Sequence, residues 1–413
     1  LLLLRFHLPM RLAAAFFVFL YIQVGNSYKF LAYSPQFAVS HVNFIAKISD
    51  ALVDAGHEVV IVAPRVNPAI RGAGTKKARV IELPENEFSQ RWQAGQERVM
   101  DLYWNSSWWD LAMEMRGAFD SIYKTVNATM TYPGLVEQLR QEKFDAAFSE
   151  LQDPAGFGLF HLAGIDKLAI TVSFTSLEFR YECTHMPTNP SYVPAIASPY
   201  GDSMSFLQRI PNFLMSAAFG SAGSILVSGL QPIFEAIQPG FPSLHDVIGN
   251  NSLVFINSEP LLDYPRPTVH RVIEIGGIVT ATKALPLNDY WSDVLNRRNN
   301  TVILSFGTYI KASTMPGEYK STIRHTLAKF PDVTFIWKYE SPEHNISAGI
   351  DNIVESTWLP QVDLLNDSRL SGFITHGGQG STLEAAFFGT PMLMVPTQGD
   401  QFRNAAMIKR AGL

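Results

Sequence analysis

A histidine followed by two glycines and a helix start, in the last third of the chain, has the spacing of a phosphate-binding turn. His376 ends a strand-like run, Gly377 and Gly378 follow it, and a helical pattern opens at Ser381. Backbone amides and the positive end of the helix would face a ligand above the sheet. Glu384 stands one turn into that helix, where its carboxylate can accept hydrogen bonds from the vicinal diol of a ribose. This spacing suits a nucleotide with a phosphate group.

Other chemically suited residues come at the ends of further expected strands. They are Gly307 with Thr308, Trp358 with Gln361, and Asp400 with Gln401. In open parallel sheets, ligands bind beyond the carboxyl ends of the strands. The indole of Trp358 offers a flat face for a base, although a lone Trp at a strand end is more often part of a core. Because all these groups fall on one edge of one sheet, they favour a nucleotide site.

A second set of residues, in the first half of the chain, suits proton transfer. His41 lies between the first expected strand and the first expected helix, and a helix N-terminus favours a neutral imidazole. An acidic partner would orient the ring, and Glu150 follows the expected strand 144–149, with Asp153 as the alternative partner. A histidine at a helix start is by itself more often structural, as we expect for His57. The nucleotide site in the second half favours His41 as a general base.

Alternating strand-like and helix-like segments place these residues. In the first half the expected strands are 28–33, 58–63, 144–149 and 168–174, with helices at 41–55 and 157–163. In the second half the expected strands are 301–306, 333–338, 353–358, 372–376 and 391–395, with helices at 381–388 and 401–410. The alternation predicts an α/β fold of two Rossmann-like, doubly wound parallel sheets. We expect an N-terminal domain over 28–265, a linker over 266–286 and an incomplete C-terminal domain over 287–413.

The composition excludes several classes of protein. The 413 residues are 47% apolar and 17% charged, with a net charge of −5, so the chain is neither disordered nor a typical nucleic-acid binder. The single cysteine, Cys183, allows neither an internal disulfide nor a cysteine-rich metal site. The sequence has no G-x-x-x-x-G-K-[ST] loop and no D-x-D triplet. We therefore expect no metal ion and no resident cofactor.

The N-terminus has the pattern of a secretory signal peptide. Counted from Met10, Arg11 precedes an apolar run over 12–24, and the small residues of 25–27 suit a cleavage site. We therefore expect 1–27 to lie outside the fold. Six N-x-[ST] sequons agree with a secretory route: Asn105, Asn127, Asn250, Asn299, Asn345 and Asn366. The apolar segment 213–230 carries several serines and glycines, and we interpret it as a buried or interfacial helix rather than a membrane span.

The strand-end residues belong to longer motifs. These are Trp358-Leu359-Pro360-Gln361 with Asp363-Leu364-Leu365, Phe373-Ile374-Thr375-His376-Gly377-Gly378 with Glu384, Gly389-Thr390-Pro391, and Gly399-Asp400-Gln401. Others are Ser305-Phe306-Gly307, Ile336-Trp337-Lys338-Tyr339 and Pro190-Ser191-Tyr192-Val193-Pro194. With these motifs the sequence resembles the UDP-glycosyltransferases, and more narrowly the animal UDP-glucuronosyltransferase branch, over nearly the whole mature chain.

The resemblance implies a GT-B fold, with the acceptor in the N-terminal domain and the UDP-sugar in the C-terminal domain. It implies that Trp358 stacks on uracil and that Gln361 and Glu384 hold the ribose. It further implies a sugar site at Asp400 and Gln401, and a pyrophosphate site at Gly307, Thr308, His376, Gly378, Gly380 and Ser381. The catalytic histidine corresponds to His41, with Glu150 where the family commonly has Asp. Gly380 stands where the family often has Asn, which leaves only its backbone N–H for a phosphate.

The function that follows from the resemblance is an inverting hexosyltransferase. We expect it to move a sugar, glucuronate before glucose, from a UDP-sugar to a hydroxyl or similar nucleophile of a small lipophilic acceptor. Arg403, near Asp400, is a candidate cation for the glucuronate carboxylate, and the aromatic-rich segment 92–109 is a candidate acceptor pocket. The family also implies a detoxifying glycoprotein of the endoplasmic reticulum lumen, anchored to the membrane by a segment beyond Leu413. It allows homo- or hetero-oligomers. An inactive UDP-sugar-binding subunit and a secreted UDP-binding protein remain alternatives.

Overall fold

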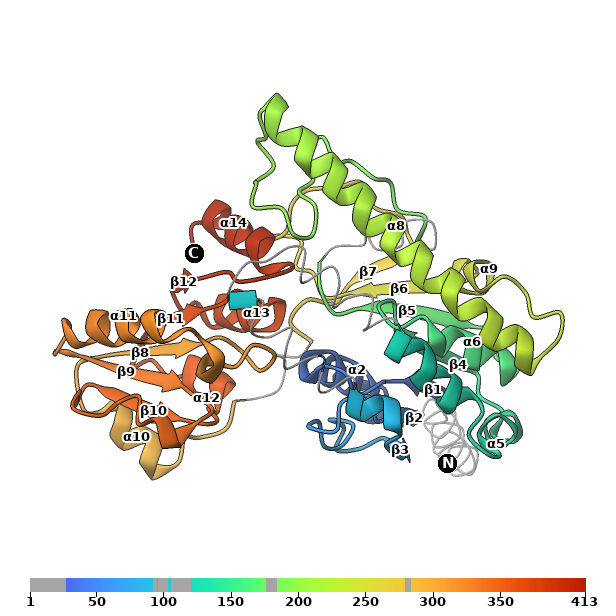
Figure 1. Cartoon of the computed structure of the whole chain (residues 1–413), viewed down its shortest axis with the longest axis horizontal. Coiled ribbons are helices and arrows are strands. Elements are labelled where there is room, and N and C mark those ends of the chain that lie inside the picture. The colour runs from blue at the N-terminus through green and yellow to red at the C-terminus, as the bar shows by residue number, and fades with distance from the viewer. Residues whose placement is uncertain (1–26, 92–94, 96–102, 105–119, 176–183, 279–283) are drawn as a thin grey trace, which may run out of the picture.

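The computed structural model describes residues 27–91, 95, 103–104, 120–175, 184–278 and 284–413 (Figure 1). The expected signal peptide lies outside these residues, apart from Ser27, as do Cys183 and the sequon at Asn105. The asparagines of the other five sequons are all exposed.

The first half of the chain forms a seven-stranded, fully parallel sheet. Its order is β3(Arg79–Leu83), β2(Glu58–Pro64), β1(Lys29–Tyr33), β4(Ala146–Glu150), β5(Leu168–Val172), β6(Leu253–Ile256), β7(Val272–Glu274). Its helices include α2(Val39–Asp54), α5(Leu135–Glu142), α6(Ala155–Leu162), α8(Phe206–Ile237) and α9(Leu244–Gly249). The run Val59–Ala63 of β2 is at most 1% exposed at every position, as expected for a strand covered on both faces.

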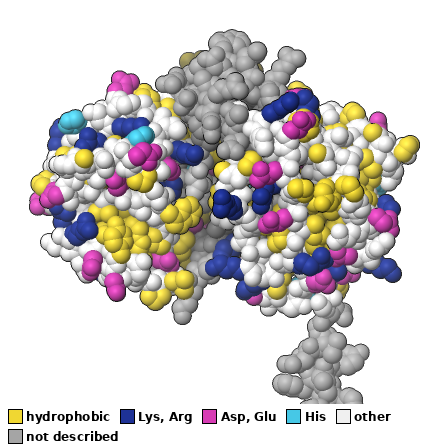
Figure 2. All heavy atoms as spheres, turned by 60° about the horizontal axis from the view of Figure 1, so that its bottom comes forward, with side chains coloured by type: hydrophobic (Ala, Val, Ile, Leu, Met, Phe, Trp, Pro, Cys, Tyr) yellow, Lys and Arg dark blue, Asp and Glu magenta, His cyan; other side chains and the backbone are white. Residues whose placement is uncertain are grey.

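The second half forms a five-stranded parallel sheet. Its order is β10(Ile353–Ser356), β9(Val333–Lys338), β8(Asn300–Ser305), β11(Leu370–Thr375), β12(Met392–Met394). The helices are α10(Asp289–Leu295), α11(Gly317–Ala328), α12(Gln361–Leu365), α13(Gln379–Phe388) and α14(Gln401–Ala411), with short 3-10 helices at Ala312–Thr314 and Pro342–His344. The expected pair of doubly wound parallel sheets is therefore confirmed. Figure 2 shows the two halves as lobes separated by a furrow.

Each sheet has a switch point where the strand order reverses. β1 lies between β2 and β4, and β8 lies between β9 and β11. Ligands of doubly wound sheets bind at such points, beyond the carboxyl ends of the strands. In the first sheet these ends lead to α2 and to Glu150, and in the second they lead to Gly307 and His376. The two switch points thus collect Glu150, Gly307 and His376, whereas Trp358 and Asp400 follow the edge strands β10 and β12.

Three details differ from the expectations. α2 begins at Val39, so His41 lies inside the first turn of the helix rather than before it. The expected linker 266–286 contains β7, which pairs with β6 at the edge of the first sheet. The expected helix at 213–230 is the middle of the 32-residue α8.

By length and composition, α8 could cross a membrane, so the expectation that no segment qualifies was wrong. Only 28% of its most apolar window is buried, although Val227, Leu230 and Phe234 of the same helix pack into the core of the first half. It is the one helix among the described residues that meets this criterion.

Candidate active site

His41 approaches a buried carboxylate across the first sheet. Its Nδ1 atom lies 2.8 Å from Oε2 of Glu150, the last residue of β4. Glu150 is only 2% exposed, and apart from this approach its Oε2 has no hydrogen-bond partner among the described residues. The other ring nitrogen, Nε2, makes no hydrogen bond with a described residue. The protein thus holds the Nδ1 side of the imidazole ring, and the Nε2 atom is available to a ligand.

Ser173, which the sequence analysis missed, contacts both members of this pair. Its backbone N–H donates to Oε1 of Glu150 at 2.9 Å, and its Oγ lies 3.0 Å from Nδ1 of His41. Ser173 directly follows β5, which neighbours β4 in the sheet. The sequence signal that could have found Ser173 is its position at the carboxyl end of β5, at the same sheet edge as Glu150. Glutamate is one methylene longer than aspartate, and the Ser173 N–H holds that longer side chain in place.

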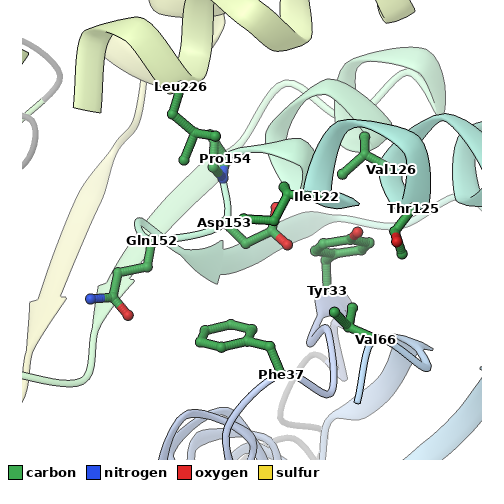
Figure 3. Close-up of a pocket in the computed structure, with 10 residues that line it drawn as sticks. All are labelled: Tyr33, Phe37, Val66, Ile122, Thr125, Val126, Gln152, Asp153, Pro154 and Leu226. Atoms are coloured by element: carbon green, nitrogen blue, oxygen red, sulfur yellow. The ribbon is translucent and has the colours of Figure 1, made fainter. Parts of the chain in front are cut away.

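Asp153, the alternative partner for His41, lies in the wall of a cavity. Its Oδ1 accepts a hydrogen bond from the Ala155 backbone N–H at 3.1 Å, at the start of α6. The cavity, of about 130 Å³, is lined mainly by apolar side chains (Figure 3). Phe37 lines it too, and the centroid of the Phe37 ring lies 4.6 Å from that of His41. An apolar cavity therefore lies beside the histidine.

The aromatic segment 92–109, expected to line an acceptor pocket, lies outside the described residues except for Gly95, Tyr103 and Trp104. Trp104 packs against the second half of the chain: its Nε1 donates to Thr314 Oγ1 at 3.1 Å, and its ring meets Phe306 edge-on. Tyr103 contacts the Tyr309 ring. These two aromatic residues therefore join the two halves, and neither lines the cavity beside His41.

Gln361 and Glu384, expected at the ribose, lie together with Ser381, expected at the pyrophosphate. The Gln361 amide donates to Glu384 Oε2 at 2.6 Å and to Ser381 Oγ at 3.1 Å, so that α12 and α13 are tied together. Burial raises the pKa of Glu384, and the hydrogen bond from Gln361 opposes that rise. Trp358 is 63% exposed, which excludes the core role that is usual for a tryptophan at a strand end. Its ring face is therefore available to a base.

His376 lies between two glycines at the second switch point. A Cβ on Gly307 would come within 2.6 Å of the His376 ring, and a Cβ on Gly378 would be equally close. Burial, followed by the charge of Lys338, lowers the pKa of His376 to about 4. The imidazole is therefore neutral at pH 7 and can exchange a hydrogen bond with a phosphate without adding charge. The close packing explains why both positions are glycine.

Lys338, a second residue that the sequence analysis left without a role, brings a positive charge to this place. It ends β9 and is 7% exposed. Its Nζ donates to the Gly307 carbonyl at 2.8 Å and lies 2.9 Å from Glu340 Oε1. The same atom lies 6.0 Å from the centroid of the Trp358 ring. Lys338 thus fixes the Gly307 loop between the expected base and phosphate positions.

The remaining expected phosphate contacts are open. Thr308 is exposed, and a Cβ on Gly380 would meet nothing within 4 Å. Gly380 lies in the first turn of α13, where backbone N–H groups have no partner within the helix. The helix N-terminus is therefore free to receive an anion.

Asp400 and Gln401 open α14 and are held by their own turn. Asn404 donates to Asp400 Oδ2 at 2.8 Å, and Gln401 Oε1 accepts hydrogen bonds from Thr397 and Gln398. Burial raises the pKa of Asp400; the hydrogen bond from Asn404 and the charge of His41 oppose this rise.

Arg403 does not serve the site as expected. Its side chain is fully buried, and its guanidinium is bonded to Asp263, Thr175 and Pro194. It therefore offers no donor to a sugar carboxylate. Among the described residues, no group of three or more His, Cys, Asp or Glu side chains could hold a metal ion.

The sequence was compared with known proteins. Residues 30–413 match the family described as "UDP-glucoronosyl and UDP-glucosyl transferase". A Caenorhabditis elegans protein, provisionally named UDP-glucuronosyltransferase ugt-55, is 30% identical over 404 residues, which are 96% of this chain and 78% of that protein. The UDP-glucuronosyltransferase 1-2 of Mus musculus is 27% identical, over 86% of this chain and 67% of its own length.

Solved structures were compared as well. The Os79 variant from O. sativa, in complex with UDP, superposes with a TM-score of 0.60 at 16% identity, over 92% of this chain and 83% of that one. The Phytolacca americana UGT2, complexed with UDP-2fluoro-glucose and pterostilbene, has a TM-score of 0.53 at 14% identity, over 93% and 84%. These similarities show that the fold is GT-B.

Proposed function

Because the chain belongs to the UDP-glucuronosyl and UDP-glucosyl transferase family, we propose that it transfers a sugar with inversion and uses His41 as the general base. The observation that carries the proposal is the 2.8 Å approach of His41 Nδ1 to the buried Glu150. A carboxylate at this nitrogen favours the tautomer whose Nε2 can accept a proton, and it stabilises the imidazolium that forms.

The reaction that we propose has one displacement. His41 Nε2 removes the proton from the acceptor hydroxyl while the acceptor oxygen attacks the anomeric carbon. The bond between that carbon and the diphosphate oxygen breaks, and UDP leaves with the bonding electrons. Attack from the face opposite to UDP turns an α-linked donor sugar into a β-glycoside. Because each half of the chain holds one substrate, most of the orientation is achieved on binding.

The second half supplies the groups for the donor. Trp358 stacks on uracil, and Gln361 and Glu384 receive the ribose. The α13 N-terminus, with Ser381 and the Gly380 N–H, faces the diphosphate together with Gly307, Thr308 and Gly378. Neutral His376 adds a hydrogen bond, and Asp400 and Gln401 receive the transferred sugar. The exposure of Trp358 and the contacts of Gln361 with Ser381 and Glu384 support this assignment.

The acceptor that we propose is small and lipophilic. The cavity beside His41 supports this class, since its walls are largely apolar and it adjoins the Phe37 ring. Its volume of about 130 Å³ is below the roughly 300–1,000 Å³ of typical ligand pockets, so it suits one ring of an acceptor.

Glucuronate is the proposed sugar because the relatives are named for it. The burial of Arg403 favours UDP-glucose as a second candidate, because the expected partner of the glucuronate carboxylate is occupied elsewhere. We further propose a membrane-bound glycoprotein of the endoplasmic reticulum, which the five exposed sequon asparagines support.

The test uses the natural full-length protein in membranes. UDP release and product mass are measured with a simple phenol and with UDP-glucuronate or UDP-glucose offered separately. The proposal expects turnover with one of the two donors and a β-linked product. UDP binding without turnover under both conditions would support an inactive binding subunit instead.

A further inference from the structure

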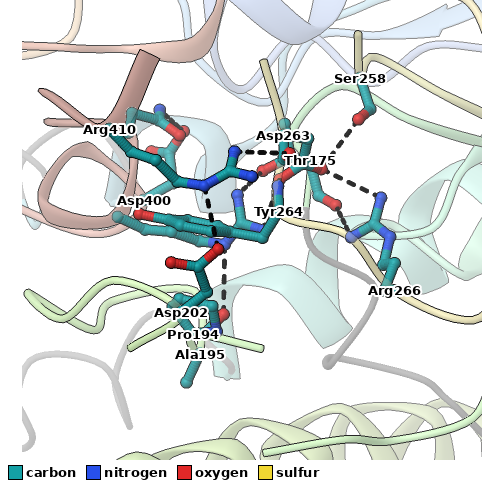
Figure 4. Close-up of polar contacts among 12 residues, drawn as sticks. Thr175, Pro194, Ala195, Asp202, Ser258, Asp263, Tyr264, Arg266, Asp400 and Arg410 are labelled. Carbon is teal, nitrogen blue, oxygen red and sulfur yellow. Dashed lines mark hydrogen bonds and ion pairs between the residues drawn. The ribbon is translucent and has the colours of Figure 1, made fainter. Parts of the chain in front are cut away.

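Arg403 joins the two halves of the molecule through every nitrogen of its guanidinium. Nη1 donates to Thr175 Oγ1 and Nη2 to Asp263 Oδ1, each at 2.6 Å, and Nε donates to the Pro194 carbonyl at 3.2 Å. Arg403 is on α14 of the second half, whereas the three acceptors precede the second sheet in the sequence. Figure 4 shows Thr175, Asp263 and Tyr264 close to one another. The contact is therefore directional as well as charged.

The carboxylate of Asp263 is the centre of the contact. It is 4% exposed, its Oδ2 accepts from Ser258 Oγ at 2.8 Å, and the Arg266 guanidinium lies 3.2 Å away. Burial alone raises a carboxyl pKa, but Arg403 and Arg266 lower the pKa of Asp263 below its ordinary value. A buried ion pair adds little stability over apolar packing, and its best-documented use is to fix a register between elements. A rigid three-nitrogen fork suits that use.

The residues joined by this contact lie close in sequence to the proposed donor-sugar site and to the proposed base. Arg403 follows Gln401 by two residues on α14, so it moves with the turn proposed to hold the donor sugar. Thr175 follows Ser173 by two residues, and Ser173 contacts both His41 and Glu150. One side chain thus joins the sugar-binding turn to the support of the base.

We propose that Arg403 is a positioning residue that sets the distance between the donor sugar and His41. This inference rests on the proposed function, because it presupposes that the donor and the base act together. Its role is the alignment of the halves, so its loss leaves the UDP site intact while misplacing the anomeric carbon. A misplacement of about 1 Å can cost about 100-fold in rate.

The main variants are Arg403→Lys, which keeps the charge but loses the fork, and Thr175→Val, which keeps the shape but removes one acceptor. The matched control is Asp202→Asn. Asp202 forms an ion pair at 2.9 Å with Arg410, which lies on α14 like Arg403. Both side chains of this pair are about one-third exposed, so the pair contributes little to stability. All proteins are full length and membrane-bound, and UDP affinity and thermal stability are measured on each.

We expect kcat to fall about 10- to 100-fold in Arg403→Lys and several-fold in Thr175→Val, with the UDP dissociation constant within about threefold of wild type. The control should retain kcat within about twofold. Wild-type kcat in folded Arg403→Lys and Thr175→Val would overturn the inference. A loss of UDP affinity parallel to the loss of kcat would also overturn it, since Arg403 would then act on the donor site.

A second measurement does not depend on turnover, so it separates this inference from the proposed function. Spin labels are placed at Lys76→Cys and Lys329→Cys, exposed positions of the two halves, in a Cys183→Ser background. We expect a narrow distribution of distances between the labels in the parent and a broader one with Arg403→Lys. Equal widths would overturn the inference, whether or not the parent transfers sugar.

Discussion

His41 and Glu150 come from adjacent parts of one sheet edge, and their side chains meet at 2.8 Å between Nδ1 and Oε2. Glu150 is buried, and Ser173 holds its other oxygen with a backbone N–H at 2.9 Å. The proposed function gives this glutamate the orienting role that the family resemblance assigns to an aspartate. The 2.8 Å distance places the carboxylate where it can orient the imidazole ring.

Removing the charge of Glu150 should lower turnover while sparing donor binding. We expect Glu150→Gln to reduce kcat by about 100-fold, because the imidazolium loses its counter-charge, with UDP affinity unchanged. The matched control is Asp153→Asn, which keeps the acceptor for the Ala155 N–H and should leave kcat within about threefold. Equal losses in the two variants would assign the orienting role to both carboxylates.

Trp358 should contribute to donor affinity and hardly to stability. Its side chain is 63% exposed, so Trp358→Ala removes little buried surface. Stacking on a base is worth about 1–3 kcal/mol, so the UDP dissociation constant should rise about 10- to 100-fold. Titration calorimetry with UDP measures this, and Trp358→Phe should recover part of the affinity. Unchanged binding by Trp358→Ala would place the uracil elsewhere.

Gly380 offers a gain-of-affinity test. A Cβ at this position meets nothing within 4 Å, so the backbone has room for the Cβ of Gly380→Asn. A new hydrogen bond from its amide to a phosphate is worth about 0.5–1.5 kcal/mol, which predicts roughly two- to tenfold tighter UDP binding. Uridine, which lacks the phosphates, is the control ligand and should bind both proteins equally. Equal tightening for uridine would show that the effect does not come from a phosphate contact.

His376 should make the protein sensitive to mild acid. Its pKa is about 4 in the folded state against an ordinary value of 6.5, so between these values the unfolded chain binds more protons. The contribution of neutral His376 to the free energy of unfolding is complete above about pH 6.5. It is lost as the pH falls toward 4, by up to about 3 kcal/mol.

Urea unfolding of the wild type and of His376→Asn, from pH 7 to pH 4, measures this contribution. Glu384 and Asp400 have raised pKa values and therefore act with the opposite sign, but both carboxylates are common to the two proteins. The difference between the two curves therefore isolates the histidine. Parallel curves would contradict the lowered pKa of His376.

The rule that ligands bind beyond the carboxyl ends of parallel strands predicted much of the UDP-sugar site from the sequence. Gln361, Ser381 and Glu384 were placed at one sheet edge by their spacing after strands, and the structure bonds them together. The same rule brought His41 and Glu150 to a common edge. It worked because a parallel sheet aligns its strand ends whatever the connecting loops do.

Two other long-range contacts could not be predicted in this way, because they depend on which side chains meet and not only on where strands end. Ser173 lies 132 residues from His41, and Arg403 lies 228 residues from Thr175. Arg403 was expected to face the sugar, because the sequence shows its position on the helix but not which neighbour covers that face. Strand β3 (Arg79–Leu83) was missed, because its mixed polar and apolar residues lack the continuous apolar run of β2.

The central claim is that His41 is the base of a UDP-sugar transferase, and one comparison tests it most directly. UDP release is measured in membranes for wild type and His41→Ala with both donors and a phenol, and UDP affinity is measured for each protein. The account predicts turnover in the wild type, a loss of at least about 100-fold in His41→Ala, and equal UDP affinity in both proteins. Undiminished turnover in folded His41→Ala would contradict it.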